Sequence, residues 1–128
     1  SLESVDAARR QHIVRWCLRR MVCGSGGYQG RSNKVSDSCY SFWIGASLDM
    51  LDASHLANPL EIRRFLSTCE NKLFGGFSKT PDTSCDPLHT YLSLCGFSIA
   101  GDQEHLSQVF CPLGMSQRAY EAFQRQLA

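Results

Sequence analysis

A repeat with an offset of 49 residues constrains the fold of this chain more than any other sequence feature. Gly26-Gly27-Tyr28 recurs as Gly75-Gly76-Phe77, and the same offset carries Asp37 onto Asp86. The other matched pairs are Ile13 and Ile62, Arg15 and Arg64, Trp16 and Phe65, and Tyr40 and His89. Matches on both sides of the Gly-Gly element indicate a supersecondary unit that is repeated along the chain.

The first unit is predicted to fold as a helix, a loop and a second helix. Apolar residues at helical spacing predict a helix over roughly Asp6–Met21, and the Gly-, Ser- and Asn-rich segment Cys23–Ser36 is typical of a loop. Asp37 is a favourable N-cap residue, so the second helix is predicted over Asp37–Leu51.

The second unit repeats this plan. We predict a helix over roughly Leu60–Cys69, a loop over Asn71–Cys85, and a helix that starts at Asp86-Pro87 and ends near Gly101. One further helix is expected over Ser116–Leu127 in the tail. No strand-like alternation stands out, so the predicted class is all-α, and stacked helix pairs of this kind form solenoids or closed toroids.

Composition narrows the classes of function. The net charge of +1 argues against a nucleic-acid partner, and no apolar stretch is long enough to span a membrane. The N-terminal segment lacks the apolar core of a signal peptide. An odd number of cysteines, seven, argues against a secreted disulfide scaffold, so we expect reduced thiols and a cytoplasmic protein.

The second helix of each unit starts with residue types that bind zinc. Asp37 and Cys39 lie at the first start, and His89 lies at the same phase of the second unit. Three protein ligands with one open position are typical of a catalytic zinc site. Spacing alone leaves a purely structural interpretation open: an N-cap aspartate, a core cysteine and a hydrogen-bonded histidine. Spacing also leaves four competing ligands open: Cys85, His12, His55 and His105.

Basic residues surround the first of these helix starts. Arg31 and Lys34 lie in the loop just before it, Tyr40 lies just inside it, and Lys79 lies in the matching loop of the second unit. Cations next to a helix N-terminus suit a phosphate or diphosphate group, although loop Lys and Arg residues are commonly only solvated. Aromatic residues near these loops fit either core packing or the wall of an apolar binding site.

Taken together, these motifs resemble the repeat of protein prenyltransferase β subunits. The segments 26–34 and 37–43 carry the resemblance in the first unit, and 75–82 and 86–91 carry it in the second. The resemblance covers roughly Arg9–Ala100. It implies that residues 1–128 form part of an α–α barrel (toroid), with two repeat units of about 49 residues and a C-terminal helix.

The resemblance also implies roles for individual residues. Zinc ligands fall on Asp37, Cys39 and His89. The remaining expected site residues are Arg31, Lys34, Tyr40 and Lys79 around the diphosphate, and Trp43 and Leu88 in the isoprenoid and peptide pocket.

Lys79, Phe42 and Leu88-His89 resemble the type I geranylgeranyl branch. The farnesyl and Rab-directed branches have Asp at the position of Lys79, and the Rab-directed branch has a second Trp at the position of Phe42. The implied reaction is zinc-dependent transfer of a geranylgeranyl group from geranylgeranyl diphosphate to the cysteine of a C-terminal CaaX-Leu motif. One Zn²⁺ per β subunit is expected, and magnesium is not expected to be required. The implied partners are a prenyltransferase α subunit and CaaX-containing small GTPases as substrates.

Two other interpretations stay open at this point. The chain fits a farnesyl or Rab-directed prenyltransferase β subunit, or a non-catalytic helical-repeat fragment that binds a partner. Because most of a barrel would lie outside 128 residues, we expect the isolated chain to be inactive or very weak.

Overall fold

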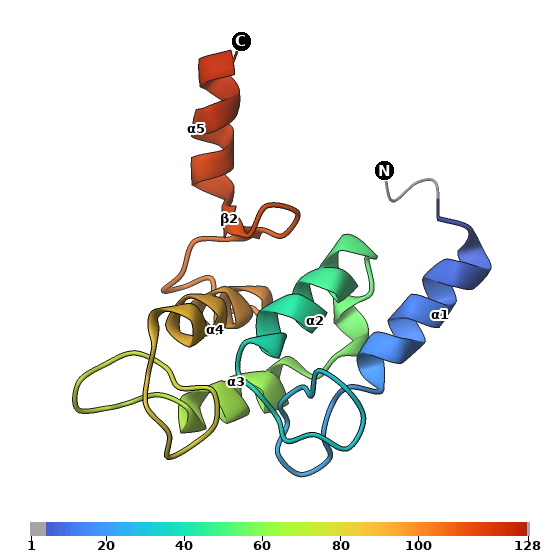
Figure 1. The fold of residues 1–128 in the computed structure, drawn as a ribbon. Coiled ribbons are helices and arrows are strands. Elements are labelled where there is room, and N and C mark those ends of the chain that lie inside the picture. Colours follow the sequence, from blue (N-terminus) through green and yellow to red (C-terminus); the bar gives the residue numbers. More distant parts are fainter. Residues whose placement is uncertain (1–4, 128) are drawn as a thin grey trace.

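The computed structural model describes residues 5–127 as a mostly helical fold, in agreement with the predicted class (Figure 1). A short antiparallel pair, β1 (Val109–Phe110) and β2 (Met115–Ser116), was not predicted and brackets a tight turn. The helices are α1 (Ala7–Leu18), α2 (Tyr40–Met50), a 3₁₀ turn (Ser54–Leu56), α3 (Pro59–Thr68), α4 (Pro87–Ile99) and α5 (Gln117–Leu127).

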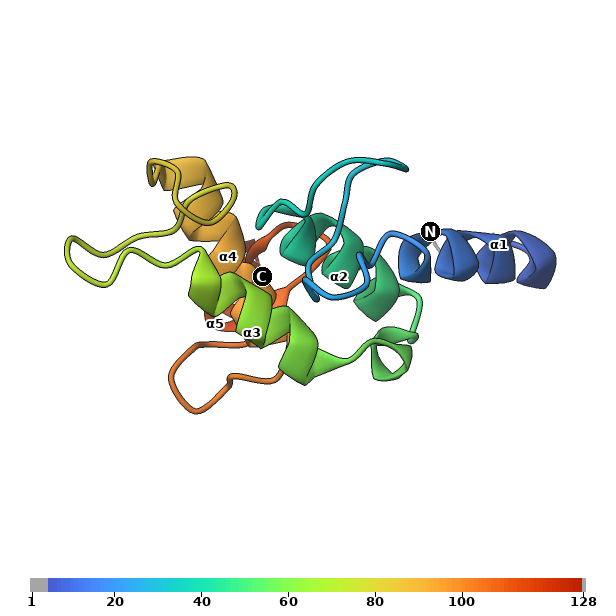
Figure 2. The same cartoon turned by 90° about the horizontal axis from the view of Figure 1, so that it is seen from below.

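The helices form two layers that follow the repeat. α2 and α4 lie side by side and share the most extensive interface between helices, while α1 packs on α2 and α3 packs on α4 (Figures 1 and 2). Leu48 and Leu66 are fully buried in the main apolar cluster between these layers. α5 projects away from the other helices (Figure 1). Within residues 5–127, no helix is both long and apolar enough to cross a membrane.

The two loops follow nearly the same backbone path. Met21 bridges Tyr28 in the first unit, and the residues 49 positions later, Glu70 and Phe77, form the same bridge. The turns agree as well, because Asn33 and Asp82 have φ values of 63° and 61°. The repeat seen in the sequence is therefore also a repeat of backbone geometry.

The start of α2 differs from its prediction, whereas the start of α4 agrees with it. Asp86 caps α4 by accepting from the His89 N–H, with Pro87 at the first helical position. Asp37 instead accepts from the N–H of Cys39, two residues along, and Cys39 is the N-cap of a helix that begins at Tyr40. Asp37 and Cys39 therefore both precede the helix, because the Asp37 side chain closes a local turn in place of a helical cap.

Smaller differences affect the other helices. Asp6 caps α1 by accepting from the Arg9 N–H, and the helix ends at Leu18, before the predicted Met21. α3 starts at Pro59 because the Asn58 side chain caps it. Ser116 belongs to β2, so α5 starts one residue later than predicted.

The close approach of α2 and α4 makes a stability prediction at Gly96. A Cβ atom there would lie 2.6 Å from Cβ of Ser41, whereas a Cβ at Gly45 would lie 3.4 Å from Ile99. We expect Gly96→Ala to lower the free energy of unfolding by about 1–3 kcal/mol, because overpacking outweighs the gain in helix propensity. Gly45→Ala, the control in the same interface, should leave stability unchanged or raise it by up to about 1 kcal/mol. Denaturant unfolding measures both, and equal effects would contradict this packing.

Candidate metal centre

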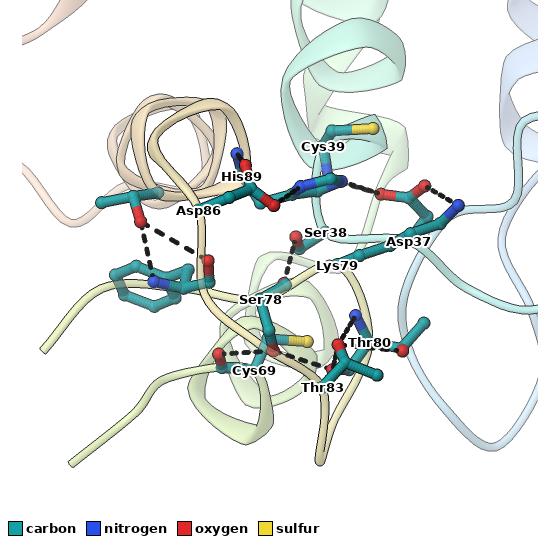
Figure 3. Close-up of polar contacts among 12 residues, drawn as sticks. Asp37, Ser38, Cys39, Cys69, Ser78, Lys79, Thr80, Thr83, Asp86 and His89 are labelled. Carbon is teal, nitrogen blue, oxygen red and sulfur yellow. Dashed lines mark hydrogen bonds and ion pairs between the residues drawn. The ribbon is translucent and has the colours of Figure 1, made fainter. Parts of the chain in front are cut away.

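Three side chains with metal-binding atoms meet where α2 and α4 begin. One ligand atom each from Asp37, Cys39 and His89 lies within 4.8 Å of the other two. Asp37 and Cys39 come from the turn before α2, and His89 comes from the first turn of α4 (Figure 3). Among the residues that the structure describes, no other group of three such side chains comes together in this way.

The spacing and chemistry of the three residues fit a transition-metal ion. Oδ1 of Asp37 lies 3.4 Å from Nε2 of His89. Two atoms bound at about 2.0–2.1 Å to one tetrahedral ion would be about 3.3 Å apart. A carboxylate, a thiolate and an imidazole are all common ligands of Zn²⁺. The residues present therefore suit a site with three protein ligands.

Asp86 fixes the orientation of His89. Its Oδ2 lies 2.6 Å from Nδ1 of His89, while its Oδ1 accepts from the His89 backbone N–H. A proton on Nδ1 leaves a lone pair on Nε2, which is the nitrogen that faces Asp37. Nε2 and the Asp37 carboxylate would then both direct lone pairs into the same space, where one cation could bind to both. Carboxylates commonly hold metal-binding histidines in this way.

Asp37 lies between the other two candidate ligands and Lys79. It is only 8% exposed, and its Oδ1 accepts from the Cys39 N–H at 3.0 Å. Its Oδ2 lies 3.7 Å from Nζ of Lys79, which belongs to the loop of the second unit. The carboxylate therefore has an ammonium group on one side and the candidate metal ligands on the other.

Binding of a metal ion by Cys39 would be coupled to loss of its thiol proton. Burial raises the pKa of the Cys39 thiol to about 12, and its hydrogen bond to Asp37 and the charge of that carboxylate add to the rise. The Lys79 ammonium opposes this rise. Because the metal ligand is the thiolate, an ion that binds here must displace a proton from Cys39.

The predicted diphosphate residues line a hollow beside the three ligands. Arg31, Lys34, Tyr40 and Lys79 surround a space of about 430 Å³, and Asp37 forms part of the same wall. Gly30 makes room for the ring of Tyr40, since a Cβ at Gly30 would lie 2.1 Å from the Tyr40 hydroxyl oxygen. Three cationic side chains therefore face a common space next to the candidate metal ligands.

The two residues predicted for the isoprenoid and peptide pocket, Trp43 and Leu88, do not line one common hollow. Trp43 is 50% exposed, packs edge-on against Phe42 and lines a separate hollow of about 310 Å³ together with Tyr91. Leu88 is 59% exposed on the first turn of α4 and does not belong to the lining of that hollow. Both side chains are open to solvent, Trp43 on α2 and Leu88 on α4.

Sequence reasoning missed some of the residues that build the site. Ser38 is fully buried between the two predicted ligands, and it donates its backbone N–H to Lys79 O and its hydroxyl to Ser78 O. No pattern in the sequence distinguishes this serine. The second role of Asp86 was detectable, because an aspartate three residues before a histidine at a helix start places both side chains on one face.

Metal binding should depend on pH through Cys39. We expect the affinity of the chain for Co²⁺, a spectroscopic probe for Zn²⁺ sites, to rise about tenfold from about pH 7 to about pH 8, because one thiol proton is displaced. Cys39→Ala should abolish the absorption from cobalt–thiolate bonding. Cys23→Ala, which removes an exposed thiol elsewhere, is the control and should change neither property. Retention of the cobalt–thiolate band in Cys39→Ala would contradict the assignment.

Comparison with known proteins extends this description. Residues 1–115 match the family described as the prenyltransferase alpha-alpha toroid domain. The chain is 41% identical over 103 residues to geranylgeranyl transferase type-1 subunit beta of Arabidopsis thaliana, which covers 80% of this chain and 27% of that protein. It is 36% identical over 110 residues to the subunit of the same name from Dictyostelium discoideum, over 86% of this chain and 30% of that protein.

A farnesyltransferase subunit and a solved geranylgeranyltransferase structure are also similar to this chain. Protein farnesyltransferase subunit beta of Saccharomyces cerevisiae is 33% identical over 103 residues, which is 77% of this chain and 24% of that protein. The solved Candida albicans protein geranylgeranyltransferase-I complexed with GGPP matches with a TM-score of 0.83 and 28% identity. That match covers 90% of this chain and 37% of the solved one.

The chain thus spans about a quarter to a third of the length of the curated relatives described above. The predicted all-α fold, with helix-pair repeats forming part of an α–α toroid, is confirmed by the family match and by the structural match. The helix layers, the repeat and these comparisons lead to one conclusion: the chain belongs to the prenyltransferase alpha-alpha toroid family.

Proposed function

We propose that this chain is the metal-binding part of the β subunit of a protein geranylgeranyltransferase type I. The observation that carries the proposal is that Asp37 belongs both to a cluster of three metal-binding side chains and to the wall of a cationic hollow. Such a pair of neighbouring sites suits a reaction in which a thiol displaces a diphosphate. The type-1 β subunits among the relatives favour a geranylgeranyl donor.

Asp37, Cys39 and His89 are the residues that would hold one Zn²⁺. The ion, when bound, would take the thiol of the protein substrate as a further ligand and favour its thiolate form. Asp86 holds the imidazole of His89 in the orientation that this requires. The turn between Asp37 and Cys39 places both side chains ahead of α2, where they face His89.

Arg31, Lys34, Lys79 and Tyr40 would bind the diphosphate. In the proposed reaction, a bond forms between the cysteine sulfur and C1 of the geranylgeranyl group while the bond from C1 to the diphosphate oxygen breaks. Negative charge builds up on the departing diphosphate, and positioned cations stabilise that charge. Lys79 would supply a fixed positive charge in place of magnesium.

The apolar side chains near the site would receive the isoprenoid and the peptide. Trp43 and Leu88 are open to solvent at the starts of α2 and α4, as the wall of a binding pocket requires. In this proposal, the chain acts together with a prenyltransferase α subunit on small GTPases that end in CaaX-Leu, and it does so in the cytoplasm. The structure of a relative in complex with GGPP supports the choice of lipid.

Replacement of Lys79 tests the diphosphate assignment. In the complete β subunit assembled with its α subunit, Lys79→Ala should raise the KM for geranylgeranyl diphosphate about tenfold, because a charge-assisted contact is lost. Lys72→Ala is the control, since Lys72 lies in the same loop and pairs with Glu70. Lys79→Asp should make transfer depend on magnesium, because it places a second carboxylate beside Asp37. An unchanged KM in Lys79→Ala would contradict the assignment.

The enzymatic proposal as a whole is tested by transfer activity and zinc content. We expect about one zinc per chain, with transfer to a CaaX-Leu peptide by the assembled subunits and little or none by the 128-residue chain alone. A preference for farnesyl diphosphate or for Rab substrates would replace type I with another branch of the family. A chain that binds no zinc and supports no transfer in the assembly would be a non-catalytic repeat module.

A further inference from the structure

Arg20 links the end of α1 to the loop that lines the cationic hollow. Its Nη1 donates to Oγ of Ser32 at 3.0 Å, and its guanidinium lies over the ring of Trp16, 5.0 Å from the ring centroid. Arg20 itself is not part of the wall of the hollow. The arginine is thus held by an aromatic ring on one side and contacts the loop on the other.

Arg20 contacts this loop at two residues, Gln29 and Ser32. The N–H of Gln29 donates to the carbonyl of Arg20 at 2.8 Å, and the Gln29 side chain accepts from the Lys34 N–H at 3.1 Å. Ser32, the second point of contact, lies between Arg31 and Lys34, which both face the hollow. The contact between Arg20 and Ser32 therefore holds the middle of the segment that carries the two cations.

The second repeat unit fixes the same turn by a different means. The offset of 49 places Pro81 at the position of Ser32 and Cys69 at the position of Arg20. The residues that follow, Asn33 and Asp82, have nearly equal φ values of 63° and 61°. A proline restricts the backbone by its ring and needs no partner. The hydrogen bond from Arg20 in the first unit and the proline in the second are alternative ways to hold one backbone shape.

We propose that Arg20 is a positioning residue that sets the affinity for diphosphate by holding the segment Arg31–Lys34 through Ser32. This inference rests on the proposed function, because it assumes that Arg31 and Lys34 bind the diphosphate. Arg20 acts through the loop and makes no contact with the ligand in this account. Without the contact, the segment samples other conformations, and binding has to restrict them again.

The expected effect is moderate because the contact lies at the surface. Loss of one exposed hydrogen bond from a charged donor should weaken binding about fivefold. Inorganic diphosphate is a suitable probe, because its competition against geranylgeranyl diphosphate reports on the cationic hollow without a contribution from the isoprenoid. The complete β subunit assembled with its α subunit is the protein to use.

A set of variants tests whether Arg20 acts through its hydrogen bond to Ser32 or through its charge. Arg20→Gln and Ser32→Ala should each raise the inhibition constant of diphosphate and the KM for geranylgeranyl diphosphate about fivefold, with kcat unchanged. The double variant should be no worse than either single one, because both remove one contact. Adding Ser32→Pro to Arg20→Gln should restore binding to within about twofold of the unaltered enzyme, since proline fixes the turn as it does in the second unit. Arg19→Gln, an equal change of charge at an adjacent exposed residue, is the control and should have no effect.

The outcomes of these experiments test the positioning role of Arg20 separately from the proposed function on which it rests. Restored diphosphate binding in the proline variant supports positioning, because proline replaces no charge. Weak binding that the proline fails to restore, with a folded protein by circular dichroism, would mean that Arg20 acts through its charge and would overturn the inference. Unaltered binding in both Arg20→Gln and Ser32→Ala would overturn it as well. An unaltered enzyme that does not bind diphosphate at all would remove the proposed function and this inference together.

Discussion

The hydrogen bonds of Ser38 are the interaction on which the candidate site depends. Ser38 belongs to the first repeat unit, yet its N–H donates to Lys79 O at 2.9 Å and its hydroxyl donates to Ser78 O at 2.7 Å, both in the second unit (Figure 3). The serine is fully buried, so loss of these bonds would leave polar groups unsatisfied in the interior. They fix the turn before α2 against the loop before α4. Together with the packing of α2 on α4, this connection brings the two helix starts, and the three candidate ligands that they carry, to one place.

A small difference between two equivalent aspartates allows the repeat to form an asymmetric site. Asp86 is followed by proline and caps its helix, so its remaining carboxylate oxygen orients His89. Asp37 is followed by Ser38 and closes a turn, so α2 begins later and both Asp37 and Cys39 stay outside the helix. One unit thus supplies two candidate ligands, and the other supplies the third candidate ligand with the carboxylate that orients it. Lys79 then joins this cluster to the cationic hollow through Asp37.

The repeat predicted the helix pairs, and the family resemblance pointed to Asp37, Cys39 and His89, but neither indicated which contacts bring these side chains together. The repeat and the Asp86-Pro87 signal located α3 and α4 to within a residue or two, because local capping chemistry decides those boundaries. The start of α2 was misplaced, because Asp37 has the same side chain whether it caps a helix or closes a turn. Ser38 and the contact between Arg20 and Ser32 depend on tertiary approach, which leaves no periodic signal. The spacing alone left Cys85 and three other histidines open as ligands; the family resemblance pointed to His89, and in the described residues the geometry brings His89, not the others, to Asp37 and Cys39.

X-ray absorption spectroscopy of the zinc-loaded chain tests most directly whether Asp37, Cys39 and His89 bind one metal ion. With these three ligands, we expect a single sulfur neighbour at about 2.3 Å, with nitrogen and oxygen neighbours at about 2.0–2.1 Å. The sulfur signal should disappear in Cys39→Ala, and the imidazole contribution should disappear in His89→Ala. Two or more sulfur neighbours, or a zinc environment that is unchanged in Cys39→Ala, would rule out this ligand set, because the ion would then be bound elsewhere.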